Sequence, residues 1–365
     1  MKKLFTLLLC AFLLCAGMTV ALAEEEETIY QCGDFEYALL DNGSAELIAY
    51  KGGFGGHVVI PNDLDGHPIM AVRQNPFISG YNLSTVAVAA DHPYLTTVGG
   101  VLFGKSDRRL IAYPAVLEDA EYTLPLGLEI IGDGAFYFCT NLTSVTIPNT
   151  VTSIGESAFW NCQSLSSLSI PDSVVSIGAS AFYNCSALTS VSIPDGITSI
   201  QPSTFSGCSG LVSISIPDSV TDIEKFAFFK CSGLASVSIP DSVVSLGEAA
   251  FSECSGLTSV SIPNGITTIE THLLSGCASL TSVTIPDSVT SISEAAFRYC
   301  TSLTSVTIPG SVGSIGYGVF IECSPDLIIT VDPGSSAEQY CKTNKLQYVY
   351  PTVSFTDAPT EWVTR

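Results

Sequence analysis

Residues 142–162 read LTSVTIPNTVTSIGESAFWNC, and this pattern returns along the chain with a period of 23 residues. Its last residue, a cysteine, recurs nine times without an insertion or deletion, at Cys139, Cys162, Cys185, Cys208, Cys231, Cys254, Cys277, Cys300 and Cys323. A proline keeps the same spacing from Pro125 to Pro309. A fixed period of this length is typical of stacked structural units, so the middle of the chain is predicted to form a solenoid.

The first half of the unit has the pattern of a short strand with one buried face. Val145 and Ile147 alternate with Ser144 and Thr146, which is the two-residue period of such a strand. Pro148 has no N–H for a strand ladder, so it is expected to end the strand and begin a turn.

The second half supplies further inward-facing residues. Val151 and Ile154 form a second apolar pair, and Ala158, Phe159 and Cys162 follow at the spacing of one helical turn. We expect a short helix or 3₁₀ segment here, with Phe159 inside. Stacked repeats would align these aromatic residues in a column of Phe136, Phe159, Phe182, Phe205, Phe228 and Phe251, followed by Leu274, Phe297 and Phe320.

The Leu-x-x-Ile-x-Ile-Pro and Ala-Phe-x-x-Cys patterns resemble those of the BspA-like bacterial leucine-rich repeat family. The resemblance covers about residues 124–323, with degenerate units before and after. It implies a leucine-rich repeat solenoid that is curved and mainly β, with short helical or 3₁₀ turns and a parallel sheet on its concave face. It also implies exposure at the cell surface, where characterised relatives adhere to host matrix proteins or to other cells. Repeat identity carries fold far better than it carries ligand.

The N-terminus has the pattern of an export signal. Lys2 and Lys3 precede an apolar run over residues 4–14, and Ala21-Leu22-Ala23 fits a small-x-small cleavage site. The run is too short for a membrane span, and no later stretch is apolar enough for one. Cleavage after residue 23 would leave 11 basic and 35 acidic residues, a formal charge of −24. That charge argues against nucleic acid and anionic membranes as direct partners.

The repeat region is expected to lie between two end regions. Asp41-Asn42-Gly43 is a hairpin signal, Ser106-Asp107 separates two apolar runs, and Ser335 or Ser336 is a candidate helix N-cap. Caps are expected because an open solenoid end exposes core and strand edges. The predicted order is a signal peptide (1–23), an N-terminal β-hairpin cap (24–55), an irregular repeat with an inserted hairpin (56–123), regular 23-residue repeats (124–326), a C-terminal cap (327–350) and a flexible tail (351–365).

Two surfaces are candidate binding sites. The outward strand positions all carry hydroxyls, among them Ser144, Thr146, Ser167, Ser190, Ser213 and Ser236. They form either a solvated sheet face, as exposed strand positions do by default, or a ligand platform. Aromatic residues between the repeated Phe and Cys are Tyr137, Trp160, Tyr183 and Phe229. They either contact a protein or a sugar, or pack between neighbouring coils.

The turn after each strand carries acidic residues at Asp172, Asp195, Asp218 and Asp241. Carboxylates repeated at strand spacing repel each other, and a calcium ion between them would relieve that repulsion. The competing interpretation is turn chemistry, because Pro-Asp-Ser and Pro-Asp-Gly are common turn sequences. The prediction is therefore no metal, with a calcium column as the alternative.

The cysteine column has three interpretations. Buried small apolar side chains are favoured, ahead of disulfides, which an exported protein can form, and of metal binding, which needs a tetrahedral cluster. Cys32 and Cys341 lie off the column and are expected to be exposed. A Cys32 nucleophile paired with His57 or His67 would make a hydrolase, but no oxyanion hole or third member accompanies it.

The sequence therefore predicts a secreted or cell-surface protein that is not an enzyme and uses no cofactor. As a monomer, it is expected to bind an extracellular protein or glycan. The runner-up is a structural spacer without a dedicated ligand, and a hydrolase using Cys32 is a distant third.

Overall fold

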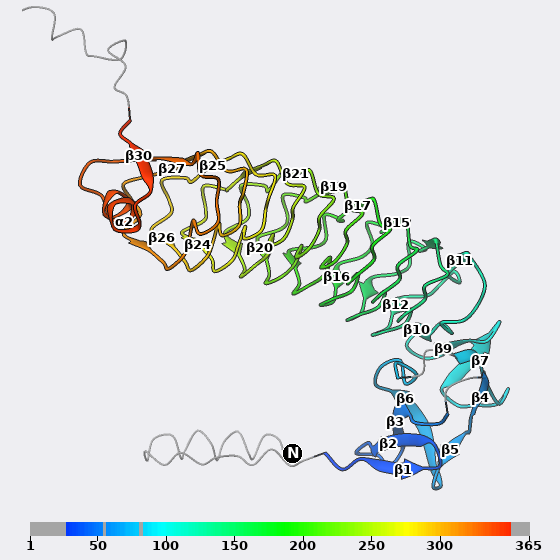
Figure 1. Ribbon diagram of the computed structural model, residues 1–365. Coiled ribbons are helices and arrows are strands. Elements are labelled where there is room, and N and C mark those ends of the chain that lie inside the picture. Colours follow the sequence, from blue (N-terminus) through cyan, green and yellow to red (C-terminus); the bar gives the residue numbers. More distant parts are fainter. Residues whose placement is uncertain (1–26, 54–55, 80–82, 352–365) are drawn as a thin grey trace, which may run out of the picture.

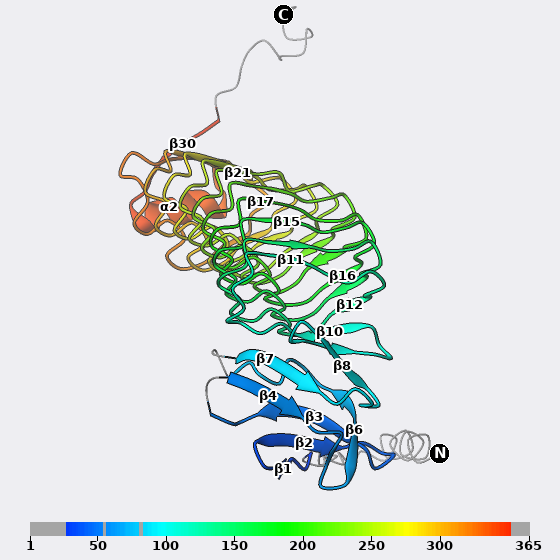
Figure 2. The same cartoon turned by 90° about the vertical axis from the view of Figure 1, so that its right-hand side faces the viewer.

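The computed structural model describes residues 27–53, 56–79 and 83–351. The predicted signal peptide (1–23) and residues 352–365 of the predicted tail lie outside the described residues. Figure 1 shows an N-terminal module that joins a long solenoid at an angle, and Figure 2 shows helix α2 (Ser336–Asn344) at the far end of that solenoid. Among the described residues, no helix combines the length and the apolar character needed to span a membrane.

The N-terminal module is built from short strands around its own core. Strands β1, β2 and β3 pair in antiparallel fashion, and the 41–43 turn connects β2 to β3. Strand β3 also pairs in parallel with β6. Strands β8, β9 and β10 form an antiparallel meander, with β9 and β10 on either side of Ser106-Asp107. The strands are β1 (Tyr30–Cys32), β2 (Phe35–Leu39), β3 (Ala45–Tyr50), β4 (Gly56–Ile60), β5 (Asp63–Leu64), β6 (His67–Val72), β7 (Leu83–Val88), β8 (Leu95–Val98), β9 (Val101–Gly104) and β10 (Arg109–Ala112).

The solenoid is a stack of repeats, each contributing one strand to a first column. Partners are parallel and 23 residues apart, as in Ser190↔Ser213. Val191 is buried between the exposed Ser190 and Ser192, as the alternation predicts. The column contains β11 (Glu121–Thr123), β13 (Ser144–Thr146), β15 (Ser167–Ser169), β17 (Ser190–Ser192), β19 (Ser213–Ser215), β21 (Ser236–Val237), β23 (Ser259–Ser261), β25 (Ser282–Thr284), β27 (Ser305–Ile308) and β29 (Ile328–Val331).

A second column of two-residue strands follows the proline turn. A hydroxyl in the turn bonds back to the preceding repeat, as when Ser173 Oγ donates to Val151 O at 2.7 Å. Strand β10 pairs with the first member and so joins the N-terminal module to this column. The members are β12 (Ile130–Ile131), β14 (Ser153–Ile154), β16 (Ser176–Ile177), β18 (Ser199–Ile200), β20 (Asp222–Ile223), β22 (Ser245–Leu246), β24 (Thr268–Ile269), β26 (Ser291–Ile292) and β28 (Ser314–Ile315).

The third side of each repeat, here named the turn column, runs from residues 134–138 to residues 318–322. The segment predicted as a short helix or 3₁₀ segment is a series of hydrogen-bonded turns. Its alternate N–H groups donate to the next repeat, at 2.9 Å from Ser157 to Ala179 O and at 2.7 Å from Asn161 to Tyr183 O. Peptides aligned in this way form hydrogen-bonded chains parallel to the solenoid axis.

This alignment requires left-handed backbone at two positions per repeat. The second of them precedes the cysteine, and φ is 62° at Asn161 and 61° at Lys230. A non-glycine residue in this region costs about 1–2 kcal/mol. The inter-repeat hydrogen bonds offset that cost, and each of them would be lost if the residue returned to an ordinary conformation.

The core of the solenoid is one continuous column of buried side chains. Phe205 and Phe228 stack with ring centroids 5.6 Å apart and planes 6° from parallel, and Phe228 stacks on Phe251 at 5.2 Å. The predicted aromatic column is therefore confirmed. Each of these rings is almost completely buried, and burying such a side chain contributes about 2 kcal/mol.

The C-terminal segment packs against the core of the solenoid. Helix α2 has Ser335 as its N-cap, which accepts a hydrogen bond from Glu338 N at 3.2 Å. Strand β30 (Gln347–Val349) pairs in parallel with β29. The expectation that Cys341 is exposed was wrong: it is completely buried, because it lies on the face of α2 that packs against the solenoid core.

Candidate functional site

The aromatic residues predicted from the turn positions come together as a stack of three rings. The Tyr137 and Trp160 centroids lie 6.1 Å apart, and those of Trp160 and Tyr183 lie 3.9 Å apart with planes 13° from parallel. All three side chains are half-buried. Each ring belongs to a different repeat, so the turn column sets their spacing. We name these three residues the aromatic stack.

Phe229 does not join the aromatic stack. The intervening repeat carries Ser206 at the same position, and its side chain is buried. Phe229 contacts Phe226 edge to face at 5.8 Å, and Lys230 Nζ lies 5.0 Å from its ring centroid. The predicted aromatic positions therefore separate into one contiguous group of three and one isolated residue.

Amide side chains run beside the aromatic stack. Gln163 Nε2 donates to Asn161 Oδ1 at 2.9 Å, and Asn184 Nδ2 donates to the same oxygen. Asn161 and Asn184 both occupy the left-handed position, which Asn tolerates better than most residues. These amide hydrogen bonds link the residues that follow Trp160 and Tyr183 in the chain, and so help to hold the two rings in place.

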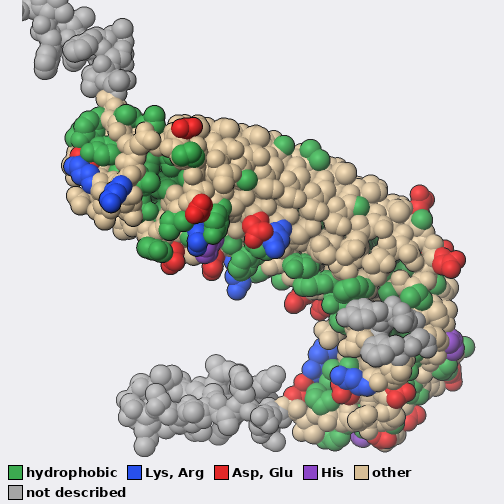
Figure 3. Space-filling model, in the orientation of Figure 1, with side chains coloured by type: hydrophobic (Ala, Val, Ile, Leu, Met, Phe, Trp, Pro, Cys, Tyr) green, Lys and Arg blue, Asp and Glu red, His purple; other side chains and the backbone are tan. Residues whose placement is uncertain are grey.

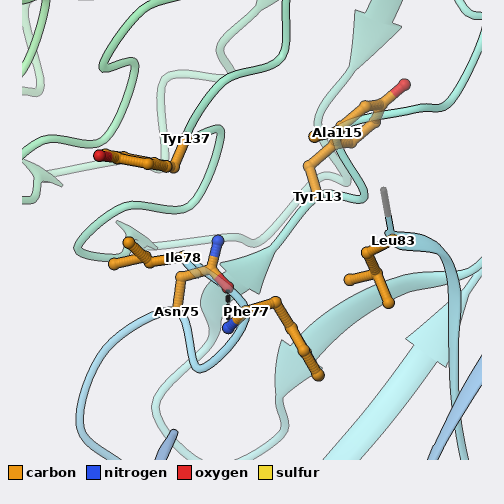
Figure 4. A pocket seen from close by; sticks show the side chains of 7 residues that line it. All are labelled: Asn75, Phe77, Ile78, Leu83, Tyr113, Ala115 and Tyr137. Carbon is orange, nitrogen blue, oxygen red and sulfur yellow. Dashed lines mark hydrogen bonds between the residues drawn. The ribbon is translucent and has the colours of Figure 1, made fainter. Parts of the chain in front are cut away.

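At its N-terminal end the aromatic stack reaches the junction with the N-terminal module. Figure 4 shows Tyr137 opposite Ile78 and Asn75 across a small cleft that Tyr113 and Ala115 also line. The cleft holds about 10 Å³, which is room for one water molecule. It lies where the N-terminal module packs against the solenoid, and it is too small for an organic ligand.

Asn75 secures that junction. Its backbone N–H donates to Asp133 O at 3.0 Å, and its Nδ2 donates to Gly134 O at 2.7 Å. The Asp133 carbonyl stands at the N-terminal end of the turn column, where no earlier repeat is present to bond it, and the Gly134 carbonyl also accepts a hydrogen bond from Tyr137 N at 3.0 Å. The side chain is buried. Sequence analysis missed Asn75 because its role depends on a contact 59 residues away.

Beyond Tyr183 the turn column continues as a polar groove of about 440 Å³. Asn184, Gly207 and Gly276 line it together with the ion pair of Lys230 and Glu253, whose charged atoms lie 3.6 Å apart. Figure 3 shows hydrophobic side chains along the lower edge of the solenoid next to the N-terminal module, with charged ones farther along that edge. The turn column thus changes from aromatic to charged along its length.

The predicted hydroxyl positions lie on the outer face of the first column. Thr146, Ser167, Ser190, Ser213 and Ser236 are exposed, and Ser144 is half-buried. Ser144, Ser167 and Ser190 line one shallow groove of about 490 Å³. This face carries neither charge nor aromatic rings at those positions, so its chemistry is limited to hydrogen bonding.

The acidic turn residues Asp172, Asp195, Asp218 and Asp241 are all exposed. Within the part of the chain that the structure describes, no three His, Cys, Asp or Glu side chains form a group able to hold a metal. The calcium column therefore remains the alternative interpretation of these residues, and no such group of ligands supports it.

The cysteine column is buried except for the half-buried Cys323, and its members are free of disulfides among the described residues. Each thiol from Cys162 onward lies close to a carbonyl oxygen of the preceding repeat, as when Cys185 Sγ donates to Phe159 O at 3.2 Å. Burial raises the pKa of the Cys185 thiol well above its usual value. The raised pKa keeps this thiol protonated at neutral pH, so the thiolate that a nucleophile or metal ligand needs is disfavoured there.

The Cys32 thiol has a carboxylate as its neighbour. A hydrogen bond with Asp65 raises the pKa of Cys32. The two histidines that were considered as its partners have other contacts: His57 Nδ1 lies 2.6 Å from Thr85 Oγ1 and His67 Nδ1 lies 2.7 Å from Gly43 O. The contact with Asp65 therefore disfavours the Cys32 thiolate.

Comparison with known families matches the repeats. The model of the BspA type leucine rich repeat region matches residues 119–235 and 221–344 in six copies. No protein with curated annotation matches the chain.

Solved structures of bacterial repeat proteins are also similar. A leucine-rich cell surface protein from Faecalibacterium prausnitzii is 25% identical, with 87% of this chain and 98% of that chain covered and a TM-score of 0.38. A leucine-rich repeat protein from Eubacterium ventriosum is 23% identical over 73% of this chain and 59% of that longer chain, with a TM-score of 0.44. One from Bacteroides ovatus is 21% identical over 88% and 100%, with a TM-score of 0.33.

Proposed function

The chain belongs to the BspA-type leucine-rich repeat family, and from this premise we propose that it is an exported, surface-associated protein that binds an extracellular macromolecule through its turn column. The family suggests a protein-binding or adhesin-like role. The export signal predicted over residues 1–23 supports a location outside the cytoplasm.

The aromatic stack is the observation that carries this proposal. Tyr137, Trp160 and Tyr183 stand side by side and half-buried, whereas most outward positions of the repeats are Ser, Thr or Gly. Tyrosine and tryptophan contribute disproportionately to binding energy at protein interfaces. Because the rings already contact each other, little side-chain entropy remains to be lost on binding.

The geometry of the aromatic stack favours a protein over a glycan. Sugar rings pack on the flat faces of aromatic side chains, but Trp160 and Tyr183 cover each other's faces at 3.9 Å. We infer that the stack presents mainly ring edges and polar tips to a partner. Such amphipathic edges suit a protein surface that combines apolar area with hydrogen-bond partners.

The test is binding of residues 24–365 to a panel of purified matrix proteins, mucins and immobilised glycans. We expect saturable binding to a protein component that is lost in Trp160→Ala and Tyr183→Ala. Tyr317→Ala is the matched control, because Tyr317 is 76% exposed and lies far along the solenoid. Running each arm with calcium and with a chelator tests the Asp172–Asp241 column at the same time. Absence of binding to every member of the panel would contradict the proposal.

The same variants distinguish the proposed binding function from two alternatives, a structural spacer and a hydrolase. A structural spacer would show no binding that depends on Trp160, although it would still be found outside the cell. A hydrolase using Cys32 would lose its activity in Cys32→Ala, whereas the binding protein proposed here keeps full binding in that variant.

A further inference from the structure

One junction between repeats lacks strand pairing on both of its strand sides. Along the described solenoid, β15 does not pair with β17 and β16 does not pair with β18, although every other junction keeps at least one of its two pairings. We name this junction the seam; it lies between residues 165–187 and residues 188–210. On the strand sides a long hydrogen bond of 3.4 Å, from Thr189 Oγ1 to Ser166 O, crosses it.

The turn column remains intact across the seam. Ser180 N donates to Pro202 O at 2.9 Å, and Asn184 N donates to Ser206 O at 2.7 Å. Behind them the Phe182 and Phe205 rings stack at 5.4 Å, with planes 8° from parallel. The two parts of the solenoid are therefore joined along one side and unpaired along the other two.

Gly196 accounts for the missing pairing in the second column. At six junctions with paired second-column strands, a turn hydroxyl donates to a carbonyl of the preceding repeat at 2.6–2.8 Å; the donors are Thr150, Ser173, Ser219, Ser242, Ser288 and Ser311. At the seam this position is Gly196, which has no hydroxyl. Without this hydrogen bond, β18 does not pair with β16.

Gly265 provides an internal comparison. It replaces the same hydroxyl 69 residues later, and there too the second-column strands β22 and β24 are unpaired. The first-column strands of that junction, β21 and β23, remain paired through Ser236↔Ser259. Loss of the hydroxyl thus coincides with loss of second-column pairing at both glycines, but only the seam loses the first column as well.

Surface grooves mark both unpaired sides. One of about 490 Å³ extends over Ser167 and Ser190 on the first column. The other, of about 400 Å³, lies between Val175 and Thr198 on the second column. Backbone groups that lack a ladder partner there are exposed to solvent, so separating the two strands breaks few bonds. Local opening concentrates where backbone hydrogen bonds are few and exposed.

We propose that the seam is a hinge, about which the repeats before residue 188 and those after it rotate as two rigid bodies. The turn column holds the two bodies together at the seam, because its hydrogen bonds and ring stack persist there while the strand sides open and close. Rigid bodies joined by a few yielding residues are a common form of protein motion. The aromatic stack ends at Tyr183 on one side of this hinge, so the motion changes its angle to the polar groove beyond it.

Hydrogen exchange of the full chain tests the hinge without any substitution. We expect the amides of residues 189–192 and 197–201 to exchange about tenfold faster than their counterparts at 212–215 and 220–224, which occupy the same positions one repeat later. Equal protection of the two sets would overturn the proposal.

Distance distributions between spin labels test the rotation itself. Labels introduced as non-natural amino acids at Thr152 and Thr221 span the seam, and labels at Thr221 and Thr290 span an equal 69 residues that include Gly265. The first pair is expected to give the broader distribution. Gly196→Ser should narrow it by restoring the hydroxyl, whereas Gly265→Ser should leave it unchanged. Equal widths for the two pairs in the unsubstituted chain would contradict a hinge.

Discussion

The Sγ atom of Cys231 donates a hydrogen bond to the carbonyl oxygen of Phe205 at 3.1 Å. The relationship recurs with the same offset, 3.2 Å from Cys208 to Phe182 and 3.1 Å from Cys254 to Phe228. A thiol fills a small apolar site and also supplies a donor to a buried carbonyl, which neither alanine nor leucine can do. The 23-residue cysteine period is thus explained by packing and hydrogen bonding together.

Because the thiols are buried, stability should fall at alkaline pH. Burial raises the pKa of Cys208 and of Cys254 to about 12, from 9.0. The folded chain keeps these protons above pH 9 while the unfolded chain releases them. Stability is therefore complete below about pH 9 and declines as pH rises towards 12. Urea unfolding between pH 7 and pH 10.5 checks this.

A variant with alanine at positions 208, 231 and 254 is the control for that titration, because tyrosines with raised pKa values act in the same direction. Its unfolding free energy should depend less steeply on pH than that of the unsubstituted chain. Identical slopes would show that the cysteine column does not carry the effect.

Removing one ring from the aromatic core should be costly, whereas removing a strand hydroxyl should not. Phe228 is completely buried between Phe205 and Phe251, so Phe228→Ala should lower the unfolding free energy by about 3–5 kcal/mol. Ser213 is exposed, and Ser213→Ala should change it by less than about 0.5 kcal/mol. Denaturant unfolding measures both, and similar losses at the two sites would mean that the inward and outward faces are misassigned.

His92 should make the N-terminal module sensitive to acid. The side chain is completely buried, and its Nδ1 accepts hydrogen bonds from Tyr94 N at 3.2 Å and Leu95 N at 3.0 Å. Burial lowers its pKa below 6.5, with nearby Lys105 acting in the same direction and Asp91 against it. The folded chain therefore resists a proton that the unfolded chain takes up.

Stability from His92 is complete above about pH 6.5 and is lost as pH falls below that value. His92→Asn keeps an acceptor for the two N–H groups and removes the titration. Its melting temperature should fall less between pH 7 and pH 5 than that of the unsubstituted chain. His57→Asn is the control: His57 is exposed, so the melting temperature of this variant should fall as much as that of the unsubstituted chain. An equal fall in His92→Asn and the unsubstituted chain would contradict the assignment.

The C-terminal segment is predicted to act as a cap, and Tyr340 is the residue to test. Its ring packs edge to face on Phe320 with the centroids 6.3 Å apart, and the backbone of Val319 and Phe320 influences the pKa of its hydroxyl, at the open end of the turn column. Tyr340→Phe should cost about 1–2 kcal/mol and increase hydrogen exchange at residues 319–322. Tyr317→Phe, on an exposed side chain, serves as the control. Unchanged exchange in Tyr340→Phe would argue that the end of the solenoid needs no cap.

The sequence predicted the repeat architecture because its signals are periodic. Burial of Phe228 and exposure of Ser213 follow from spacing alone, since a stacked repeat has to place the same positions inside in every coil. The rings of Tyr137, Trp160 and Tyr183 stack because these residues occupy equivalent positions in adjacent repeats, which the sequence shows, although the stacking itself was not predicted.

What the sequence did not predict depends on individual residues. Left-handed backbone at Lys230 and Glu253 has no signal in those residue types, because neighbouring repeats impose it. Cys341 was placed outside because it lies off the repeat, whereas its burial is set by the packing of α2. The role of Gly196 requires knowing that its counterparts donate a hydroxyl hydrogen bond.

The binding role of the aromatic stack is tested most directly by affinity measurements on matched variants. A partner from the panel of extracellular proteins is titrated with the unsubstituted chain, Trp160→Ala, Tyr183→Ala and Tyr317→Ala, all confirmed to be folded. We expect a loss of about tenfold or more in the first two variants and no change in the third. Equal affinity of all four proteins would contradict the claim that this chain binds its partner through the aromatic stack.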